Sequence, residues 1–170
     1  DSEAIINLAI SELLLGRYVS GWKHYEARWT TQITSCVPRR FAQPCWKGER
    51  LAGRTLLLYG EQGFGDTIQF SRYAKLAAER GGRVIIECQP SLKGILRTVA
   101  GASHVIGYGE QLPPFDIQAP LLSLPGVFQT TLETIPSAVP YLSVPSDIFV
   151  KLPASSGAPL KVGLAWCGSR

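Results

Sequence analysis

Residues 54–80 read RTLLLYGEQGFGDTIQFSRYAKLAAER, an apolar run followed by a glycine-rich turn and an amphipathic stretch. The run 55–59 is hydrophobic and bounded by a glycine, which is typical of a parallel strand buried on both faces. Glycines crowd the turn, where they let backbone N–H groups point outward and let a ligand approach the chain closely. Apolar residues then recur at helical spacing from 68 to 77. Strand, turn and helix predict the first half of a βαβ unit, whose ligand crevice lies at the carboxyl end of the strand.

Short apolar segments continue after this unit and predict three further strands, at 83–88, 104–107 and 115–119. Pro90 begins a short helix that is predicted to run to about residue 99. Because strands and helices alternate, the sequence favours an α/β fold with a Rossmann-like open parallel sheet of the doubly wound type over residues 54–158.

The remaining parts of the chain have different patterns. Residues 1–30 predict two short helices joined by a tight turn at Gly16, an antiparallel helical hairpin. Residues 31–53 contain prolines and glycines with little periodicity, which predicts a connector. Residues 159–170 begin with an apolar strand and end in a glycine turn, as expected for the start of a second α/β domain. Because the chain lacks methionine and begins at Asp1, we expect it to be a piece of a longer protein.

Composition excludes several classes of protein. A net charge of +4 without a dense basic face disfavours a nucleic-acid partner. The four cysteines are dispersed without C-x-x-C spacing and away from both histidines, so we expect no metal site and reduced thiols in the cytoplasm. Since no apolar run approaches the roughly 20 residues of a membrane span, the sequence predicts that the chain is not transmembrane.

The candidate site lies at the glycine turn. Asp66 follows Gly65 in the first turn of the predicted helix, where a carboxylate can satisfy free N–H groups and the helix dipole. The same carboxylate at the mouth of a crevice can act as a general base that takes a proton from a hydroxyl group. The functional interpretation requires that Asp66 faces an open cleft. Gln69 lies one helical turn further along and is expected to position an acceptor, whereas Tyr73 is expected in the core.

Two nucleotide-binding motifs can be compared with the sequence of this turn. A phosphate-binding P-loop is excluded because no Gly-Lys-Ser or Gly-Lys-Thr follows the glycines. A dinucleotide fingerprint fits better, because Gly63 and Gly65 supply two glycines and Glu87 lies where an acid would hold a ribose. Ile68 stands where the third glycine belongs, and Asp66 would set a negative charge beside the pyrophosphate. This hypothesis therefore ranks second.

Two known families resemble parts of the chain. The hairpin resembles one tetratricopeptide repeat, in the stretches Asn7-Leu8-Ala9 and Leu15-Gly16-Arg17-Tyr18 and at Gly21 and Tyr25. It departs from that repeat at Arg28, where alanine is usual, and in lacking the closing proline. Residues 61–73, EQGFGDTIQFSRY, look like the Gly-Asp turn of glycosyltransferases of the lipopolysaccharide heptosyltransferase type (glycosyltransferase family 9), in the form fused to tetratricopeptide repeats in bacterial proteins. Residues 162–168, VGLAWCG, are similar to the start of their nucleotide-sugar-binding domain.

The resemblance implies a two-domain GT-B enzyme, of which this chain holds the last repeat and the acceptor-side domain. It implies that Asp66 is the catalytic base and that the turn contacts substrate, through Gly63, Phe64, Gly65, Gln69, Glu61 and Gln62. Turn solvation is the alternative interpretation of Glu61 and Gln62. The donor would be a nucleotide sugar, with no metal or other cofactor, and the acceptor a hydroxyl group of a glycan, lipid or protein. The isolated piece is expected to be inactive because the donor domain is missing.

Partners and location follow from the same resemblance. A tetratricopeptide array would offer a surface for a protein partner, and the reaction would take place in the cytoplasm or at the inner face of the membrane. Two alternatives stay open: a non-catalytic interaction module in which the repeats recruit a partner, and an oxidoreductase that binds an NAD-type dinucleotide.

Overall fold

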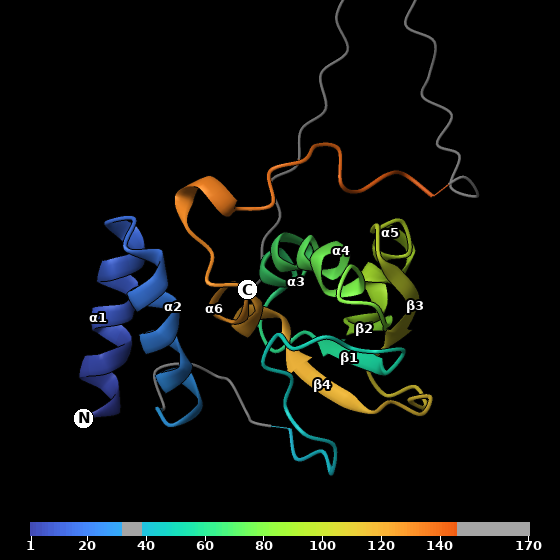
Figure 1. The fold of residues 1–170 in the computed structure, drawn as a ribbon, viewed down its shortest axis with the longest axis horizontal. Coiled ribbons are helices and arrows are strands. Elements are labelled where there is room, and N and C mark those ends of the chain that lie inside the picture. Colours follow the sequence, from blue (N-terminus) through green and yellow to red (C-terminus); the bar gives the residue numbers. More distant parts are fainter. Residues whose placement is uncertain (32–38, 146–170) are drawn as a thin grey trace, which may run out of the picture.

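A computed structural model describes residues 1–31 and 39–145, which form a helical hairpin beside an α/β domain (Figure 1). Predicted features between these ranges or after them, among them Cys36, Cys167 and the strand at 159–166, lie outside the described residues. In chain order the α-helices (α), 3-10 helices (η) and strands (β) are α1 (Ser2–Leu14), α2 (Tyr18–Tyr25), η1 (Glu26–Trp29), β1 (Thr55–Tyr59), α3 (Phe64–Ser71), α4 (Tyr73–Ala78), β2 (Arg83–Cys88), η2 (Pro90–Leu92), α5 (Lys93–Leu96), β3 (Ala102–Gly107), β4 (Ile117–Pro120), η3 (Leu121–Ser123), α6 (Leu124–Val127) and η4 (Leu132–Thr134).

The four strands form one parallel sheet in the order β3-β2-β1-β4, which confirms the predicted α/β fold with a parallel sheet. Leu57 in β1 lies opposite Ile85 in β2 and Gln118 in β4. The strand order therefore reverses beside β1, with β2 and β3 on one side and β4 on the other. In open α/β sheets, this switch point is where the crevice for a ligand opens at the carboxyl ends of the strands.

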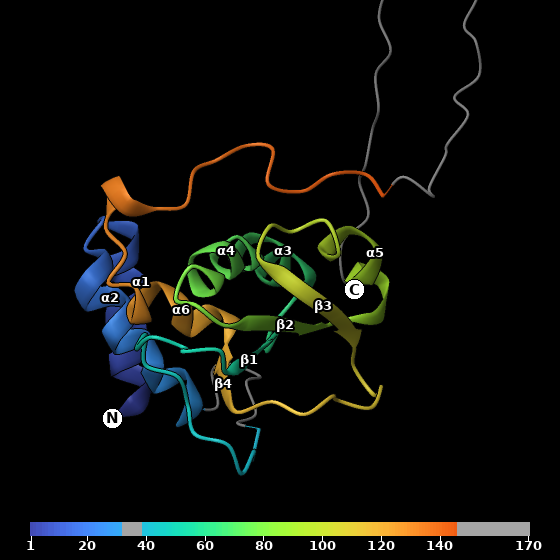
Figure 2. The same ribbon diagram turned by 45° about the vertical axis from the view of Figure 1, so that its right-hand side comes forward.

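The two faces of the sheet are covered differently. On one face, residues such as Leu56, Leu58 and Ile86 pack against α3, α4 and α5 in the main hydrophobic core (Figure 2). On the other, Leu57, Ile85 and Ile106 pack under three loop residues, Phe41, Leu112 and Phe115. The expected doubly wound arrangement is therefore incomplete, since the described residues place no helix on this second face. The connection between β3 and β4 is too short for a crossover helix and contains Pro113 and Pro114.

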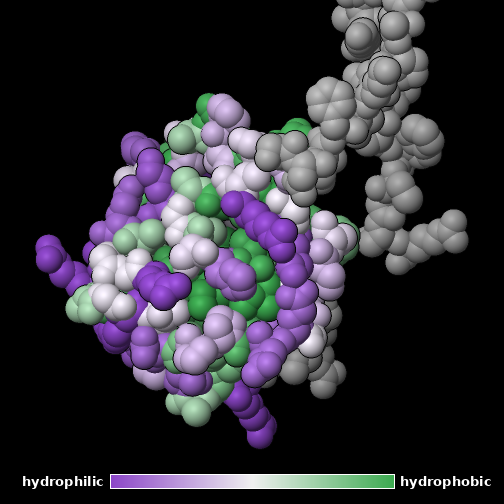
Figure 3. Space-filling view, turned by 90° about the vertical axis from the view of Figure 1, so that its right-hand side faces the viewer, coloured by the Kyte–Doolittle hydropathy of each residue, from purple (hydrophilic) through white to green (hydrophobic). Residues whose placement is uncertain are grey.

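Hydrophobic residues are visible inside a ring of hydrophilic ones on the side of the molecule where β3 and α5 lie (Figure 3). Some hydrophobic residues are therefore exposed on this side of the molecule.

The hairpin packs as part of the same core. Its helices run antiparallel, and α1 ends before Gly16, which has the positive φ of +76° that favours glycine (Figure 1). Trp22 in α2 meets the ring of Phe70 in α3 edge to face, with 5.4 Å between the ring centroids. Because Trp22 and Tyr25 pack against the buried core, the hairpin is joined to the α/β domain by apolar contact.

Two predicted helices are shorter than expected. The helix predicted after the glycine turn is interrupted at Arg72, because the Ser71 hydroxyl donates to the carbonyl of Ile68 at 2.7 Å and competes with the helical bonds. The helix expected to reach residue 99 is a 3-10 turn followed by α5, which ends at Leu96. The four predicted strands that fall within the described residues are confirmed within two residues at each end.

Gly101 is predicted to be the least replaceable of the glycines with positive φ. A Cβ there would lie 2.6 Å from the Cα of Lys75 and 2.7 Å from the carbonyl oxygen of Ala74. Gly101→Ala should lower the free energy of unfolding by about 2–4 kcal/mol, because backbone strain and overpacking add together. Gly81→Ala is the matched control, since Gly81 has a similar φ of +84° and nothing within 4 Å; it should cost about 1 kcal/mol. Urea unfolding of both variants measures the difference, and equal losses would contradict this packing of the turn before β3 against α4.

Candidate functional site

The glycine turn leads directly from β1 into α3. Asp66 is the third residue of α3, and its Oδ2 accepts a hydrogen bond from the N–H of Gly63 at 3.1 Å. This confirms the capping interpretation of the carboxylate. Asp66 is only partly buried, so it is not sealed beneath packed side chains.

The residues around Asp66 lie on the outside of the turn. Phe64 exposes 54% of its surface, and Gln69 is exposed one helical turn after Asp66. Gly65 has no described neighbour that a Cβ would meet within 4 Å, whereas a Cβ at Gly60 would lie 2.6 Å from the hydroxyl of Tyr108. Internal packing therefore explains why residue 60 is a glycine, but it does not explain the glycine at position 65. Tyr73 is 3% exposed and shares a hydrogen bond with Thr130, which confirms its place in the core.

Glu61 points the other way, into the crevice at the switch point. Its side chain is 3% exposed, and its Oε1 accepts from Arg28 Nη2 at 3.1 Å and from the N–H of Leu122 at 3.2 Å. Turn solvation is therefore the wrong interpretation of Glu61. An arginine from the hairpin pairs with it instead, between the turn after β1 and the turn after β4.

Arg28 is fully buried and belongs to a small polar network. Its guanidinium donates to Ser123 Oγ at 2.7 Å and to Glu26 Oε1 at 2.8 Å, and it lies 4.3 Å from the centre of the Trp29 ring. Arg28 is also the position at which the hairpin departs from the tetratricopeptide pattern. That departure was the signal in the sequence that could have pointed to this residue, but its partner 33 positions away could not be read from it.

Gln62 is also held by its neighbours. Its side chain donates to the hydroxyl of Tyr25 at 2.9 Å, and its carbonyl accepts from Gln89 at 2.7 Å. Glu61 and Gln62 line a hollow of about 370 Å³, which the other predicted site residues do not line. Arg39 and Glu87 also line this hollow, and they form an ion pair. The structure thus divides the predicted site in two. Glu61 and Gln62 form an inner pair, and Gly63 to Asp66 form an outer group with Gln69.

Burial and the charge of Arg28 have opposite effects on the pKa of Glu61. Burial raises the pKa of its carboxyl group to about 7, although the neighbouring Arg28 lowers that pKa. Burial likewise raises the pKa of Tyr108, in the same hollow, to about 12. The charge of Glu61 therefore changes near neutral pH.

Within residues 1–31 and 39–145, no three His, Cys, Asp or Glu side chains gather into a group that could hold a metal ion. No helix in these ranges is both long and apolar enough to cross a membrane.

Comparison with known proteins gives one short similarity. The chain is 34% identical to the protein FlbA of Caulobacter vibrioides over 59 residues, which are 35% of this chain and 10% of FlbA. No protein-family model matches the chain. No solved structure matches it either.

Stability is predicted to depend on pH through Glu61. With a pKa of about 7 in the folded chain against 4.5 in the unfolded chain, the folded state binds more protons between these values. The free energy of unfolding should therefore fall as pH rises from 4.5 to 7, by up to about 3 kcal/mol relative to Glu61→Gln, and stay constant above pH 7. Urea unfolding of both proteins across this range measures the difference.

Glu110→Gln is the control for this experiment. Glu110 is exposed, and its hydrogen bond from Lys93 lowers its pKa, so its contribution is lost as pH falls, the opposite direction. A constant difference between the original chain and Glu61→Gln from pH 5 to 8 would show that Glu61 stays charged throughout.

Proposed function

We propose that this chain is the acceptor-side part of a two-domain GT-B glycosyltransferase that moves a sugar from a nucleotide sugar to a hydroxyl acceptor. The observation that carries the proposal is the arrangement around Asp66. A partly exposed carboxylate lies at the start of a helix, beside Gly65 with no close described neighbour and an exposed Phe64. This surface suits a substrate better than it suits internal packing.

Asp66 would act as the base in this reaction. Its Oδ2 is oriented by the N–H of Gly63, which leaves Oδ1 to accept the proton of the acceptor hydroxyl. The hydroxyl oxygen then attacks the anomeric carbon, the bond from that carbon to the diphosphate breaks, and the nucleoside diphosphate leaves with the electron pair. We expect the reaction to need no metal and to take place in the cytoplasm or at the inner face of the membrane.

The hairpin would be the last of several tetratricopeptide repeats. Its helices approach closely at Gly21, where a Cβ would lie 2.8 Å from the side chain of Leu13. Such repeats use small residues for this approach. α1 also exposes several large apolar residues, Ile5, Leu8, Ile10 and Leu14. A preceding repeat would cover such a face, because one unit alone cannot bury it.

An interaction module is the second candidate. It is favoured by Arg28, which brings the hairpin into the switch-point crevice and pairs with Glu61 there. A hairpin fixed in this way would hold the repeats at a constant angle to the α/β domain, as a scaffold requires. The dinucleotide hypothesis is less favoured, because Glu87, the acid that would hold a ribose, pairs with Arg39.

Replacing the proposed base in the full-length protein tests the transferase proposal. Release of nucleoside diphosphate is measured from a panel of UDP-, GDP- and ADP-linked sugars with a bacterial cell extract as the source of acceptors. Asp66→Asn keeps the capping oxygen but loses the base, so it should lower the rate by about 10²–10⁴-fold.

Asp116→Asn is the matched control. Asp116 also accepts one backbone N–H, that of Thr55 at 2.7 Å, but it does so at the opposite end of β1. This variant should keep the original rate. An unchanged rate in Asp66→Asn would show that the base assignment is wrong, and no release from any donor would favour the interaction module.

A further inference from the structure

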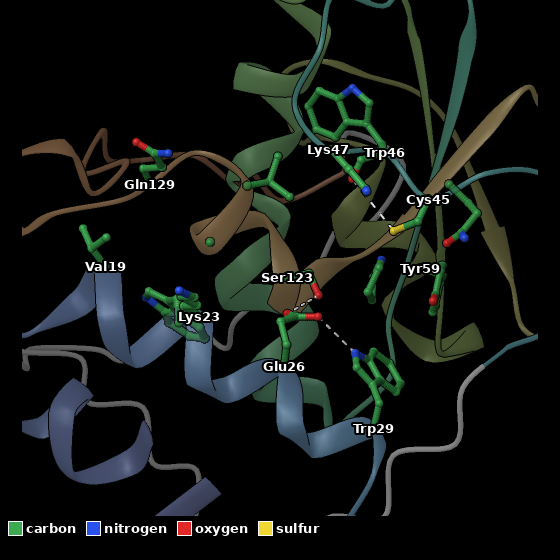
Figure 4. A pocket seen from close by; sticks show the side chains of 15 residues that line it. Val19, Lys23, Glu26, Trp29, Cys45, Trp46, Lys47, Tyr59, Ser123 and Gln129 are labelled. Carbon is green, nitrogen blue, oxygen red and sulfur yellow. Dashed lines mark hydrogen bonds between the residues drawn. The ribbon is translucent and has the colours of Figure 1, made fainter. Parts of the chain in front are cut away.

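A second and larger hollow lies between the hairpin and the α/β domain (Figure 4). Its volume is about 620 Å³, within the range of about 300–1,000 Å³ that is typical of small-molecule sites. Its walls come from α2 and η1, from residues 45–47, from the ends of β1 and β4, and from η3, α6 and Gln129. None of the residues predicted from the sequence to form the site lines it.

The walls are rich in aromatic rings: Trp22, Trp29, Trp46 and Tyr59. Two of the indole N–H groups already have acceptors, Trp29 with Glu26 Oε2 and Trp46 with the carbonyl of Glu49. Trp22 and Trp29 are partly exposed and offer mainly apolar ring surface to the hollow, whereas Trp46 and Tyr59 are buried behind it. Such surfaces favour an aromatic guest, stacked or edge to face.

One buried amide lacks a partner in this lining. Gln118 is 9% exposed, and its Oε1 has no hydrogen bond from any residue in the described ranges. Its backbone is fixed, because its N–H donates to the carbonyl of Pro44 and its carbonyl accepts from Trp46. A buried acceptor without a donor costs roughly 1–3 kcal/mol. The Oε1 atom has almost no exposed surface of its own. A ligand N–H would therefore reach it once the side-chain amide turns toward the hollow, and would then remove this cost.

The charge of the lining is positive. Lys23 on α2 and Lys47 on the segment beside β4 both line the hollow and come from different walls (Figure 4). Both are exposed, and neither forms an ion pair with a residue of the described part of the chain. The acid in the lining, Glu26, is already bound by Arg28, Ser123 and Trp29. An anionic group on the ligand would therefore have an ammonium group on each of two walls with which to pair.

We propose that this hollow binds a planar aromatic molecule that carries an N–H donor and an anionic group. The ring would pack among the aromatic residues, the N–H would donate to Gln118, and the anion would lie near Lys23 and Lys47. Because the walls belong to both the hairpin and the α/β domain, the ligand would also stabilise their junction. The proposal does not depend on the transferase reaction, since Asp66 is not part of this lining.

Calorimetric titration of the full chain with three probes tests the proposal. Indole-3-acetate has all three features, 1-naphthaleneacetate lacks the N–H, and indole-3-acetamide lacks the charge. Indole-3-acetate should bind most tightly and raise the melting temperature, with about tenfold weaker binding for each of the other two.

Three variants assign the binding to this hollow. Lys23→Gln with Lys47→Gln should weaken indole-3-acetate about tenfold and abolish its preference over the acetamide. Gln118→Met should abolish its preference over 1-naphthaleneacetate. Lys75→Gln, an exposed lysine on α4, is the control and should change nothing.

Circular dichroism establishes that each variant is folded before titration. The proposal is overturned if no probe binds at millimolar concentration. It is equally overturned if the lysine and Gln118 variants bind all three probes as the original chain does.

Discussion

The position of the hairpin depends on the buried contact between Arg28 and Glu61. A guanidinium with no exposed surface must be compensated by hydrogen bonds and opposite charge, because removing a buried ion's partner costs several kcal/mol. Arg28 finds this compensation at Glu61, Ser123 and Glu26, so the network spans the hairpin, the turn after β1 and the turn after β4. With the apolar contact of Trp22 on Phe70, it fixes the hairpin over the switch point of the sheet.

This contact gives the two halves of the glycine turn different roles. Glu61 and Gln62 face the hairpin and are held by Arg28 and Tyr25. The following residues, from Gly63 to Asp66, begin α3 and lie on the outside, where Asp66 remains partly exposed. The sequence motif looks like one site, but its residues have two roles. Glu61 and Gln62 join the hairpin to the α/β domain, and Gly63 to Asp66 present an exposed surface. The proposed transferase chemistry belongs to the outer half alone.

The docked hairpin also creates the large hollow, whose walls come from segments distant in sequence. Trp22 and Trp29 belong to the hairpin, Trp46 to the connector, and Tyr59 and Gln118 to the sheet. No local pattern links these residues, and Gln118 resembles an ordinary polar position in a strand. Only the packing of the hairpin against β1 and β4 places its amide beside aromatic rings and two lysines.

The sequence by itself determined the elements whose signal is local: the unbroken apolar run of β1, the glycine turn, the periodic helices, and the capping position of Asp66. Those features follow from side-chain spacing and backbone preference within a few residues. The tertiary structure alone decided that Glu61 is buried and that one face of the sheet is covered by Phe41, Leu112 and Phe115. It also decided which side chains meet in the large hollow. These outcomes depend on contacts between distant segments, such as Arg28 with Glu61 33 positions apart, and such pairings leave no periodic trace in the chain.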